Sequence, residues 1–593
     1  MQIQYKNKRL ERVLIGVNAL IAAVVVASFV LLFGFDVNDP PIPAWILYSV
    51  QAVLLCAFVA EKIVRLFNSV SKAEFWRANR FEIPLLLGLA IAVLGAGRWF
   101  SPSGTEAAVV RHLAVGVYLA VQVVAKLCRT SVNLAASGQN TTRTLVASFL
   151  VLIISGAGLL MLPKASAENT ESLSLVDALF TATSATCVTG LIVKDTQNFS
   201  LMGQVVILML IQLGGLGIVV FGAVFALLLG QALSVRERVA MQDLLSARTL
   251  SRIGNMITFI IIGTILIEAV GAISLFGMWD GDIKRKWFYC VFHSISAFCN
   301  AGFSLYSRSF EDYDRSWQVY VVICPLIILG GLGFSVLYDL INIAVDRIKR
   351  FFKKWFNKRY RFSMEAPKRM RLQTKIVLSV SASLIVLGML AILLFERYAS
   401  PGDSAAKTDV LGALFQSITA RTAGFNTVDV SAMSPSSRFV LILLMFIGGS
   451  PGSTAGGIKT VTLAVVIMIA VAALRKRQEV EMFKRSVRVV VVGRAITVTL
   501  LFVAVLFCAT LALSISENSN GFAISDIAFE AASALGTVGL TTGVTPFLTT
   551  AGKLIIITAM LIGRLGPLTL LAALTFNLRP ARYNYPDEAI IVG

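Results

Sequence analysis

Cys187-Val188-Thr189-Gly190-Leu191 is the first of four short stretches in which a polar-to-apolar segment ends in a glycine and a large apolar residue. The other three are Cys299-Asn300-Ala301-Gly302-Phe303, Arg421-Thr422-Ala423-Gly424-Phe425 and Gly536-Thr537-Val538-Gly539-Leu540. The shared glycines are 112, 122 and 115 residues apart, and each stretch lies between two long apolar segments. A single chain that repeats helix, re-entrant loop and helix four times can surround an ion path.

The composition places the chain in a lipid bilayer. Of its 593 residues 56% are hydrophobic and only 15% are charged, whereas soluble domains carry about 25% charged residues. Apolar runs of about 20 residues recur, which is the length that crosses the hydrocarbon layer as a helix. Because backbone groups in lipid must be satisfied internally, we expect an all-α polytopic membrane protein.

The apolar runs predict twelve spans. Four precede the first glycine stretch, at about 13–35, 43–66, 82–99 and 108–127. Eight form four pairs around the glycine stretches, at 143–163 with 203–230, 256–278 with 317–345, 375–397 with 437–470, and 491–514 with 552–577. The predicted units are an N-terminal four-span bundle and four pore repeats, with the C-terminal tail in the last repeat: 1–135, 140–254, 255–373, 374–489 and 490–593.

Basic residues gather in alternate loops. The net charge is +20, and the segment from Arg347 to Lys375 alone holds twelve basic residues. Lys and Arg are retained on the cytoplasmic side of membrane proteins, so this charge does not indicate nucleic-acid binding. With twelve spans, both termini are expected in the cytoplasm and the four glycine loops enter from outside.

Each glycine stretch follows a short amphipathic run that contains a phenylalanine: Phe180, Phe292, Phe415 or Phe529. Runs of 10–14 residues are too short to span and suit re-entrant helices, whose dipoles favour a cation at their inner ends. A glycine then allows the strained turn that directs carbonyl groups toward an axis. The predicted potassium filter comprises Val188, Thr189, Gly190, Asn300, Ala301, Gly302, Thr422, Ala423, Gly424, Thr537, Val538 and Gly539.

Glycines in apolar helices also serve helix–helix contact, and one isolated copy would favour that interpretation. Four copies at similar spacing favour a pore. The third repeat has one residue fewer between its phenylalanine and its glycine than the others. The carbonyl register of that quarter therefore does not follow directly from the other three.

A second cluster of small residues interrupts the apolar stretch 437–470. The run Gly448-Gly449-Ser450-Pro451-Gly452-Ser453-Thr454-Ala455-Gly456-Gly457 breaks a helix, and broken helix at membrane depth must be buried or line a cavity. A phosphate-binding loop is disfavoured, because Ile458 separates Gly457 from Lys459 and no strand precedes. Arg564 is a charge within the last span and is a functional candidate by its depth. The predicted gate residues are Gly448, Gly449, Gly452, Ser453, Gly456, Gly457 and Arg564.

These motifs resemble the Ktr/Trk/HKT superfamily of potassium transporters, in particular the membrane subunit of the Ktr type. The resemblance covers about residues 140–593. Besides the glycine stretches it rests on Gln212-Leu213-Gly214-Gly215-Leu216-Gly217, Gly330-Gly331-Leu332-Gly333-Phe334 and the ending Tyr585-Pro586-Asp587-Glu588-Ala589-Ile590-Ile591-Val592-Gly593.

The resemblance implies a pseudo-fourfold pore in one subunit that carries potassium, often with sodium dependence. It further implies a homodimer in the bacterial inner membrane, on a cytosolic ring of nucleotide-binding regulatory subunits. It places the 448–457 segment as an intramembrane gate, with Arg564 beside it below the filter. No organic cofactor is expected in this chain.

Other functions remain as alternatives. An alternating-access cation symporter would show inverted or parallel halves, which four like-oriented repeats disfavour. A membrane enzyme is disfavoured because no His, Cys and carboxylate set converges. Voltage sensing by the extra N-terminal spans is disfavoured because the fourth carries only Arg111, Lys126 and Arg129. Glu268 has no partner that the sequence identifies, and His293 is expected to be a packing residue.

Overall fold

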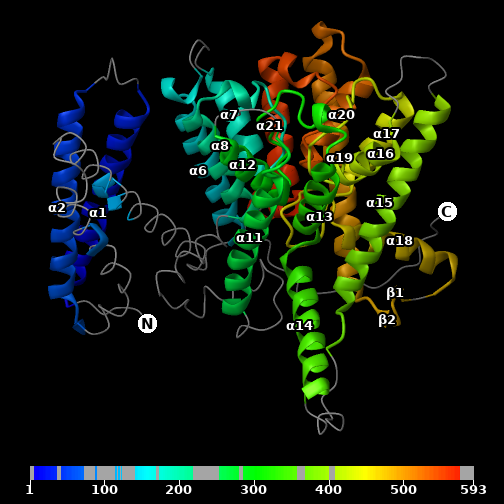
Figure 1. The fold of residues 1–593 in the computed structure, drawn as a ribbon, viewed down its shortest axis with the longest axis horizontal. Coiled ribbons are helices and arrows are strands. Elements are labelled where there is room, and N and C mark those ends of the chain that lie inside the picture. The colour runs from blue at the N-terminus through cyan, green and yellow to red at the C-terminus, as the bar shows by residue number, and fades with distance from the viewer. Residues whose placement is uncertain are drawn as a thin grey trace, which may run out of the picture.

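A computed structural model of the chain contains two groups of helices (Figure 1). The structure describes a few residues between 87 and 122 and the ranges 6–35, 42–72, 141–167, 173–217, 253–279, 285–356, 368–399, 408–477 and 479–574. The expected spans at 82–99 and 108–127, the end of the span at 203–230 and the C-terminal tail therefore lie largely outside the described residues.

The described residues from 141 onward repeat one three-part unit. Its first helix is α6 (Thr141–Leu160), α11 (Ile253–Leu275), α15 (Leu372–Ala399) or α19 (Val489–Ser516). A short helix follows, which is α7 (Leu175–Cys187), α12 (Lys286–Cys299), α16 (Val410–Thr419) or α20 (Ile524–Gly536). We call these four the pore helices. The unit ends in α8 (Leu201–Leu216), α13 (Cys324–Leu332), α17 (Pro435–Phe446) or α21 (Thr550–Leu565).

The last helix of each unit is shorter than the sequence predicts. The predicted spans 317–345 and 552–577 are each bent, because α13 meets α14 (Phe334–Phe356) at 104° and α21 meets α22 (Pro567–Leu574) at 95°. Gly333 and Gly566 at these bends both have a φ of +83°, which only glycine adopts readily. The helix before the segment 448–457 likewise stops, at Phe446, and α18 (Thr460–Leu474) follows it. The helix breaks thus recur at one position in the repeat.

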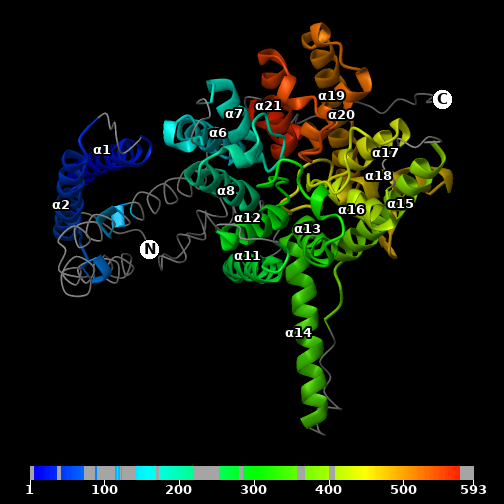
Figure 2. The same cartoon turned by 45° about the horizontal axis from the view of Figure 1, so that its top comes forward.

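Among the residues that the structure describes, four long helices could each cross a bilayer by length and composition, and up to six spans result if each bent pair counts as one. Short 3-10 turns connect the other elements: η1 (Pro163–Ala165), η2 (Thr196–Asn198), η4 (Glu311–Tyr313), η7 (Asn518–Asn520) and η8 (Thr545–Phe547). The segment η5 (Val319–Ile323) is a π-helical turn before α13. One hairpin, β1 (Glu481–Met482) with β2 (Arg485–Ser486), follows α18. Figures 1 and 2 show α14 projecting away from the bundle.

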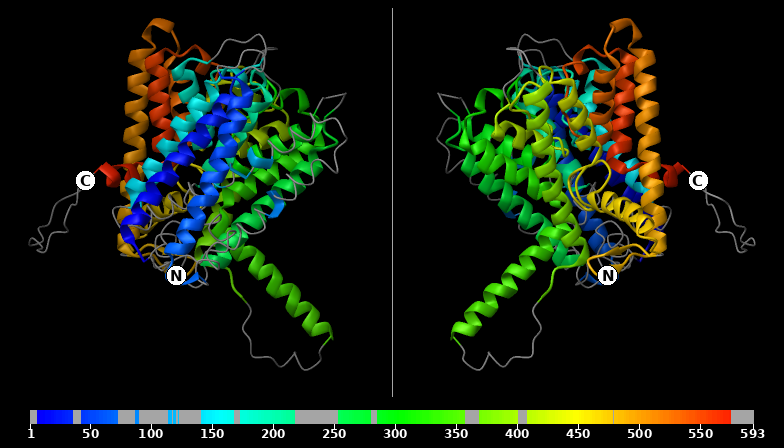
Figure 3. Two further views of the ribbon diagram at one scale, coloured as in Figure 1. Left: turned by 90° about the vertical axis from the view of Figure 1, so that its left-hand side faces the viewer. Right: turned by 90° about the vertical axis from the view of Figure 1, so that its right-hand side faces the viewer.

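The N-terminal helices α1 (Lys8–Phe33) and α2 (Ala44–Asn68) pack side by side apart from the repeats (Figures 1 and 3). The Arg65 side chain lies 2.6 Å from a Glu61 carboxylate oxygen and 3.5 Å from one of Glu11. The end of α1 approaches the first repeat, where the Lys164 N–H donates to the Gly34 carbonyl at 3.1 Å. This pair corresponds to the first two predicted N-terminal spans.

Four hydrophobic cores join the repeats into a closed circle. Each pore helix packs against the third helix of the preceding repeat: α12 on α8, α16 on α13, α20 on α17, and α7 on α21. The pore-helix phenylalanines Phe180, Phe292, Phe415 and Phe529 are all fully buried. Phe415 lies in the core of the second repeat and Phe292 in that of the first, while Phe180 lies in that of the fourth. Each repeat therefore completes the core of the one before it.

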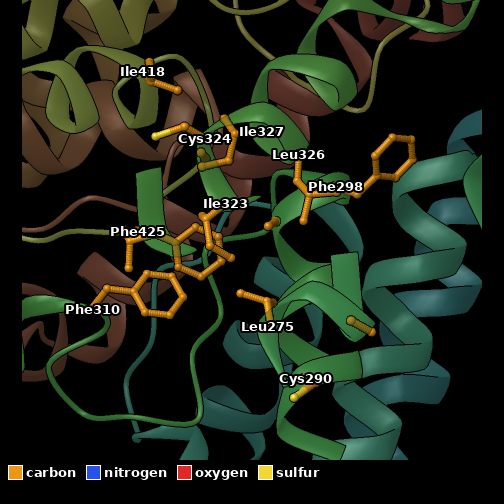
Figure 4. Close-up of a cluster of buried hydrophobic side chains, with 14 of the residues drawn as sticks. Leu275, Cys290, Phe298, Phe310, Ile323, Cys324, Leu326, Ile327, Ile418 and Phe425 are labelled. Carbon is orange, nitrogen blue, oxygen red and sulfur yellow. The ribbon is translucent and has the colours of Figure 1, made fainter. Parts of the chain in front are cut away.

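Figure 4 shows the core between the second and third repeats, where Phe310 and Phe425 lie near one another. Their ring centroids are 5.1 Å apart. Ion pairs reinforce two of the four junctions at the pore-helix N-termini. Lys553 Nζ lies 2.7 Å from Asp177 Oδ1, and Arg438 Nη1 lies 2.7 Å from Asp526 Oδ1. Both aspartates are thirteen residues before the glycine of their repeat, where an acid also complements the helix dipole.

Candidate functional site

Three pore helices end in the same turn. Val188, Asn300 and Thr537 follow α7, α12 and α20 and have φ values of +58°, +58° and +51°. In each turn the next N–H returns to the carbonyl five residues earlier, as from Thr189 to Ser184 at 2.8 Å. This is a left-handed helix C-cap, with a non-glycine residue in the left-handed position. Such a conformation costs about 1–2 kcal/mol and persists only where surrounding packing imposes it.

The third repeat reaches the same endpoint by another route. Here α16 ends at Thr419, five residues before its glycine, whereas the other pore helices end three residues before theirs. The Ala423 N–H donates to the Thr419 carbonyl at 2.9 Å, and Thr422 adopts a φ of +76°. An earlier helix end and a different turn thus absorb the missing residue, and the left-handed residue again lies two places before the glycine.

The four glycines form one ring, which we call the glycine ring: Gly190, Gly302, Gly424 and Gly539. All have positive φ, between +70° and +95°. A Cβ built on Gly190 would lie 3.0 Å from the Gly302 Cα, one on Gly302 would lie 2.9 Å from the Gly424 Cα, and one on Gly539 would lie 3.0 Å from the Gly190 Cα. Consecutive repeats are therefore neighbours, and the fourth closes on the first.

Backbone carbonyls occupy the space between these glycines. The Ala301 oxygen lies 2.5 Å from the Cβ position of Gly190, and the Ala423 oxygen lies 2.9 Å from that of Gly302. The Val538 and Thr189 oxygens stand in the same relation to Gly424 and Gly539. The four oxygens belong to equivalent residues, each directly before its glycine. Four carbonyl dipoles therefore lie between the four glycines.

Hydroxyl groups hold the turns from behind. Ser184 Oγ accepts from the Gly190 N–H at 3.1 Å, and Ser533 Oγ accepts from the Gly539 N–H at 3.1 Å. In the other two repeats the hydroxyl donates to the carbonyl after the glycine, from Ser296 to Phe303 at 2.8 Å and from Thr419 to Phe425 at 2.6 Å. The buried hydroxyls of Thr189, Thr422 and Thr537 have no hydrogen-bond partner. Unpartnered buried oxygens at this place are what a coordinated or hydrated cation would satisfy.

The loop between α17 and α18, Ile447–Lys459, lies directly against one side of this ring. A Cβ on Gly456 would meet the side chain of Thr537, with Thr537 Cγ2 at 2.9 Å. Several hydrogen bonds attach the loop to the end of α13. Among them, the Ser450 N–H donates to the Gly331 carbonyl at 3.0 Å, and the Phe334 N–H donates to the Gly452 carbonyl at 3.1 Å. The loop thus sits beneath the ring and is fastened to the helix break of the second repeat.

Two cationic side chains bind carbonyls of this loop. Arg564 Nη1 donates to the Thr454 carbonyl, and its Nη2 donates to the Gly214 and Gly215 carbonyls at the end of α8. Lys459 Nζ donates to the Ala455 carbonyl at 2.7 Å. Arg564 follows Gly563, which is equivalent to Gly214 and Gly330, so it replaces the glycine at position 215 or 331 of the other repeats. The arginine therefore connects the fourth repeat to the loop of the third and to the first repeat.

On the other side of the ring, the loops after the glycines carry acidic residues. Glu311 Oε1 accepts from Asn426 Nδ2 at 2.5 Å, and the Phe310 N–H donates to the Asn426 carbonyl at 3.0 Å. Partial burial, and next the nearby Asp429 carboxylate, raise the pKa of Glu311 above its ordinary value. This group of loops, which we call the mouth, couples the second and third repeats and carries acidic side chains.

The predicted filter residues thus come together from all four repeats, and the predicted gate residues meet around the α17–α18 loop. Gly452 differs in that its Cβ position faces open space, although its carbonyl accepts the Phe334 N–H. Glu268 lies elsewhere, on α11, where its Oε2 accepts from Gln212 Nε2 at 3.2 Å. Sequence reasoning did not identify Lys459 as a loop ligand. It also missed the packing role of Gly214, Gly330 and Gly563, whose Cβ positions would strike backbone oxygens of the pore helices. The repeated Gly three places before each helix break was the signal that could have revealed them.

Comparison with known proteins assigns the family. The model of the TrkH family, described as cation transport protein, matches residues 110–582. The chain belongs to this family.

Several relatives share most of the chain. It is 38% identical over 462 residues to the Ktr system potassium uptake protein B of Bacillus subtilis, covering 76% of this chain and 96% of the relative. It is 36% identical over 457 residues to the potassium/sodium uptake protein NtpJ of Enterococcus hirae, with coverage of 76% and 96%. The crystal structure of the potassium transporter TrkH from Vibrio parahaemolyticus matches with a TM-score of 0.56 at 19% identity, covering 84% of this chain and 96% of that one.

These findings confirm a polytopic, mostly helical membrane protein of the Ktr/Trk type. They also place the chain among transporters, the class that sequence reasoning preferred to a membrane enzyme. The residues before 110 lie outside the family match.

Proposed function

We propose that the protein takes up potassium ions through a gated, channel-like pore whose selectivity filter is the glycine ring. The observation that carries this proposal is the set of four equivalent carbonyls, from Thr189, Ala301, Ala423 and Val538, which lie between the four glycines. Rings of backbone carbonyls replace the hydration shell of a potassium ion. The full proposed filter adds the left-handed residues Val188, Asn300, Thr422 and Thr537.

The α17–α18 loop is the proposed gate. It lies against the ring at Thr537, and Arg564 and Lys459 bind its carbonyls. A loop held by side-chain hydrogen bonds, rather than by a continuous helix, can be released without unfolding the bundle. The Arg564 guanidinium below a cation filter would also raise the barrier to permeation while the loop is in place.

An alternating-access symporter is the competing function. Four repeats that meet in one ring disfavour it, because alternating access requires two halves that rock about a shared site. The names of the relatives, one of them a potassium/sodium uptake protein, support potassium as the substrate and leave room for sodium dependence. We retain the five units given above, 1–135 through 490–593, as the proposed domains.

The proposed setting is the bacterial inner membrane with both termini in the cytoplasm, so that Glu311 faces outward and the α17–α18 loop faces inward. The proposed assembly is a homodimer on a cytosolic ring of nucleotide-binding subunits. The basic segment from Arg347 to Lys375, which includes part of the projecting helix α14, is then on the cytosolic side.

The test is uptake by potassium-starved cells that lack their own importers. Cells are transformed with the full chain, alone and together with a nucleotide-binding regulatory subunit of the Ktr type, and rubidium tracer uptake is measured against external potassium. We expect saturable, potassium-competed uptake when both are present. Absence of uptake from membranes in which the chain is abundant would refute the proposal, and uptake of sodium alone would refute the proposed substrate.

A further inference from the structure

Each pore helix carries a buried polar residue directly after its phenylalanine, at one equivalent position. These residues are Thr181, His293, Gln416 and Glu530. At most 1% of the surface of each is exposed. They lie behind the glycine ring, between the pore helix and the chain that leaves the ring. Burying a polar side chain is costly unless it is hydrogen-bonded, so their partners indicate what they do.

Glu530 binds the chain that leaves the fourth glycine. Its Oε1 accepts from the Thr542 N–H at 3.0 Å and also from the Thr541 hydroxyl. Its Oε2 accepts from the Thr545 hydroxyl at 2.7 Å. Three donors from residues two, three and six places after Gly539 therefore converge on one carboxyl group. Three hydrogen bonds to one buried carboxyl group hold this loop firmly, because leaving its oxygens without partners would be costly.

His293 binds the same two positions in the second repeat. Its Nε2 accepts from the Leu305 N–H at 3.3 Å, and the Ser304 Oγ lies 3.2 Å away from the same nitrogen. Its Nδ1 lies 2.8 Å from the Tyr289 carbonyl. Because a carbonyl only accepts and an amide N–H only donates, the imidazole carries its hydrogen on Nδ1 and is neutral. Ser304 and Leu305 are two and three places after Gly302, as Thr541 and Thr542 are after Gly539.

In the other two repeats the equivalent side chain makes one weak contact or none with the chain after the glycine. Gln416 Nε2 reaches the Val428 carbonyl only at 3.4 Å, and its Oε1 is buried without a partner. Thr181 Oγ1 donates to the Asp177 carbonyl within its own helix at 2.9 Å. In the glycine ring, the second and fourth repeats lie across from each other, since each contacts the first and the third. The two firm attachments therefore face one another across the axis.

We propose that Glu530 and His293 are positioning residues that fix the filter in the second and fourth repeats and thereby set its preference for potassium over sodium. This inference rests on the proposed function. The two side chains contact no ion; they act through the backbone that leaves each glycine. Selectivity depends on the coordinating carbonyls of the filter, and a firmly held loop keeps their number and arrangement fixed whereas a loosened loop does not. In the third repeat the chain after Gly424 is attached to the second repeat instead, where Asn426 Nδ2 donates to Glu311 Oε1 at 2.5 Å.

The test compares selectivity among variants of the full chain. Selectivity is the ratio of two concentrations: the sodium concentration that halves rubidium tracer uptake, divided by the potassium concentration that halves it. Glu530→Ala removes all three acceptor contacts, and Glu530→Gln keeps one carbonyl oxygen as an acceptor. His293→Leu removes both ring nitrogens, whereas His293→Gln can still place an acceptor near the Leu305 N–H. We expect Glu530→Ala and His293→Leu to lower the preference roughly tenfold, since losing hydrogen bonds to such groups costs energies of that order. The two glutamine variants should lie between these and the unchanged protein.

Glu517→Gln is the matched control. Glu517 is also fully buried in the fourth repeat and accepts from the Thr549 hydroxyl at 2.6 Å and from Asn520 at 2.7 Å. It joins the end of α19 to the N-cap of α21, and its hydrogen bonds do not reach Thr541, Thr542 or Thr545, which Glu530 holds. Its substitution should reduce the amount of protein in the membrane and leave the selectivity ratio unchanged.

Unchanged selectivity in Glu530→Gln and His293→Leu, with both proteins present in the membrane, would overturn the proposal even if Glu530→Ala failed to fold. A changed ratio in Glu517→Gln would overturn it as well, because the effect would then be general. Failure of the proposed function is distinguishable, since the unchanged protein would then show no potassium-competed uptake at all.

Discussion

Replacing Gly302 with serine is the sharpest perturbation of the glycine ring. Gly302 has a φ of +70°, and a Cβ there would lie 2.9 Å from both the Ala423 oxygen and the Gly424 Cα. Both neighbours are backbone, so neither can rotate away as a flexible side chain could. To reach the 3.4 Å of an ordinary contact, the third filter loop must move by about half an ångström.

Two costs follow from this substitution. The left-handed backbone costs about 1–2 kcal/mol with any side chain, and the displaced loop disturbs the carbonyl spacing on which selectivity depends. Gly521→Ser separates the backbone cost from the displacement of the filter loop. Gly521 has a φ of +68° with nothing near its Cβ position, so a serine there carries only the backbone cost. Both variants should lose the stability that the left-handed backbone costs, and Gly302→Ser should lose more because its Cβ also strikes backbone atoms. Only Gly302→Ser should lose selectivity, by roughly tenfold if about 1.4 kcal/mol of the potassium preference is lost.

Two measurements are needed. Tracer uptake with sodium competition gives the selectivity ratio. Thermal unfolding of the purified chain in potassium or sodium chloride gives ion binding without the regulatory subunit, because a ligand at about 100 times its dissociation constant stabilises by about 2.7 kcal/mol. The excess stabilisation by potassium should fall in Gly302→Ser and persist in Gly521→Ser. Unchanged potassium preference in a folded Gly302→Ser protein would refute the assignment of the filter.

Three further predictions concern the gate and the mouth. Arg564→Gln should raise the maximal uptake rate several-fold at a similar KM, because it loses the contacts of Arg564 to Thr454 and α8. The control is Arg438→Gln, which breaks an ion pair away from the loop and should not raise the rate. An equal or lower rate for Arg564→Gln would contradict the role of Arg564 at the gate. Deletion of residues 448–457 should also raise flux, and reduced flux in well-folded protein would count against gating. The KM for potassium should rise as external pH falls toward the raised pKa of Glu311, because protonation removes negative charge from the mouth. This pH dependence of the KM should flatten in Glu311→Gln. An identical pH profile in both proteins would rule out Glu311 as the source of the pH dependence.

The repeat and the residues at its glycines could be predicted from sequence because their spacing and composition are local properties. The bends at Gly333 and Gly566 could not, since a glycine in an apolar run is compatible with either a straight helix or a break. The hydrogen-bond partners of Arg564 could not be predicted from the sequence either. They lie 110 and 350 residues away in the chain, and only closure of the circle of repeats brings them together.

The third repeat shows the same division most clearly. Its missing residue was visible in the sequence, but the consequence was not. The structure places Gly424 in the ring by ending α16 early and changing the turn, because packing against the second and fourth repeats fixes where the glycine must lie.

The sequence by itself determined the membrane class, the four repeats and the identity of the ring residues, because hydropathy and glycine spacing act within a short length of chain. The tertiary structure alone decided the order around the axis, the interlocking of each phenylalanine with the preceding repeat, and the attachments of Glu530 and His293. These depend on backbone groups from separate segments meeting at hydrogen-bond distance, and no local pattern encodes that meeting.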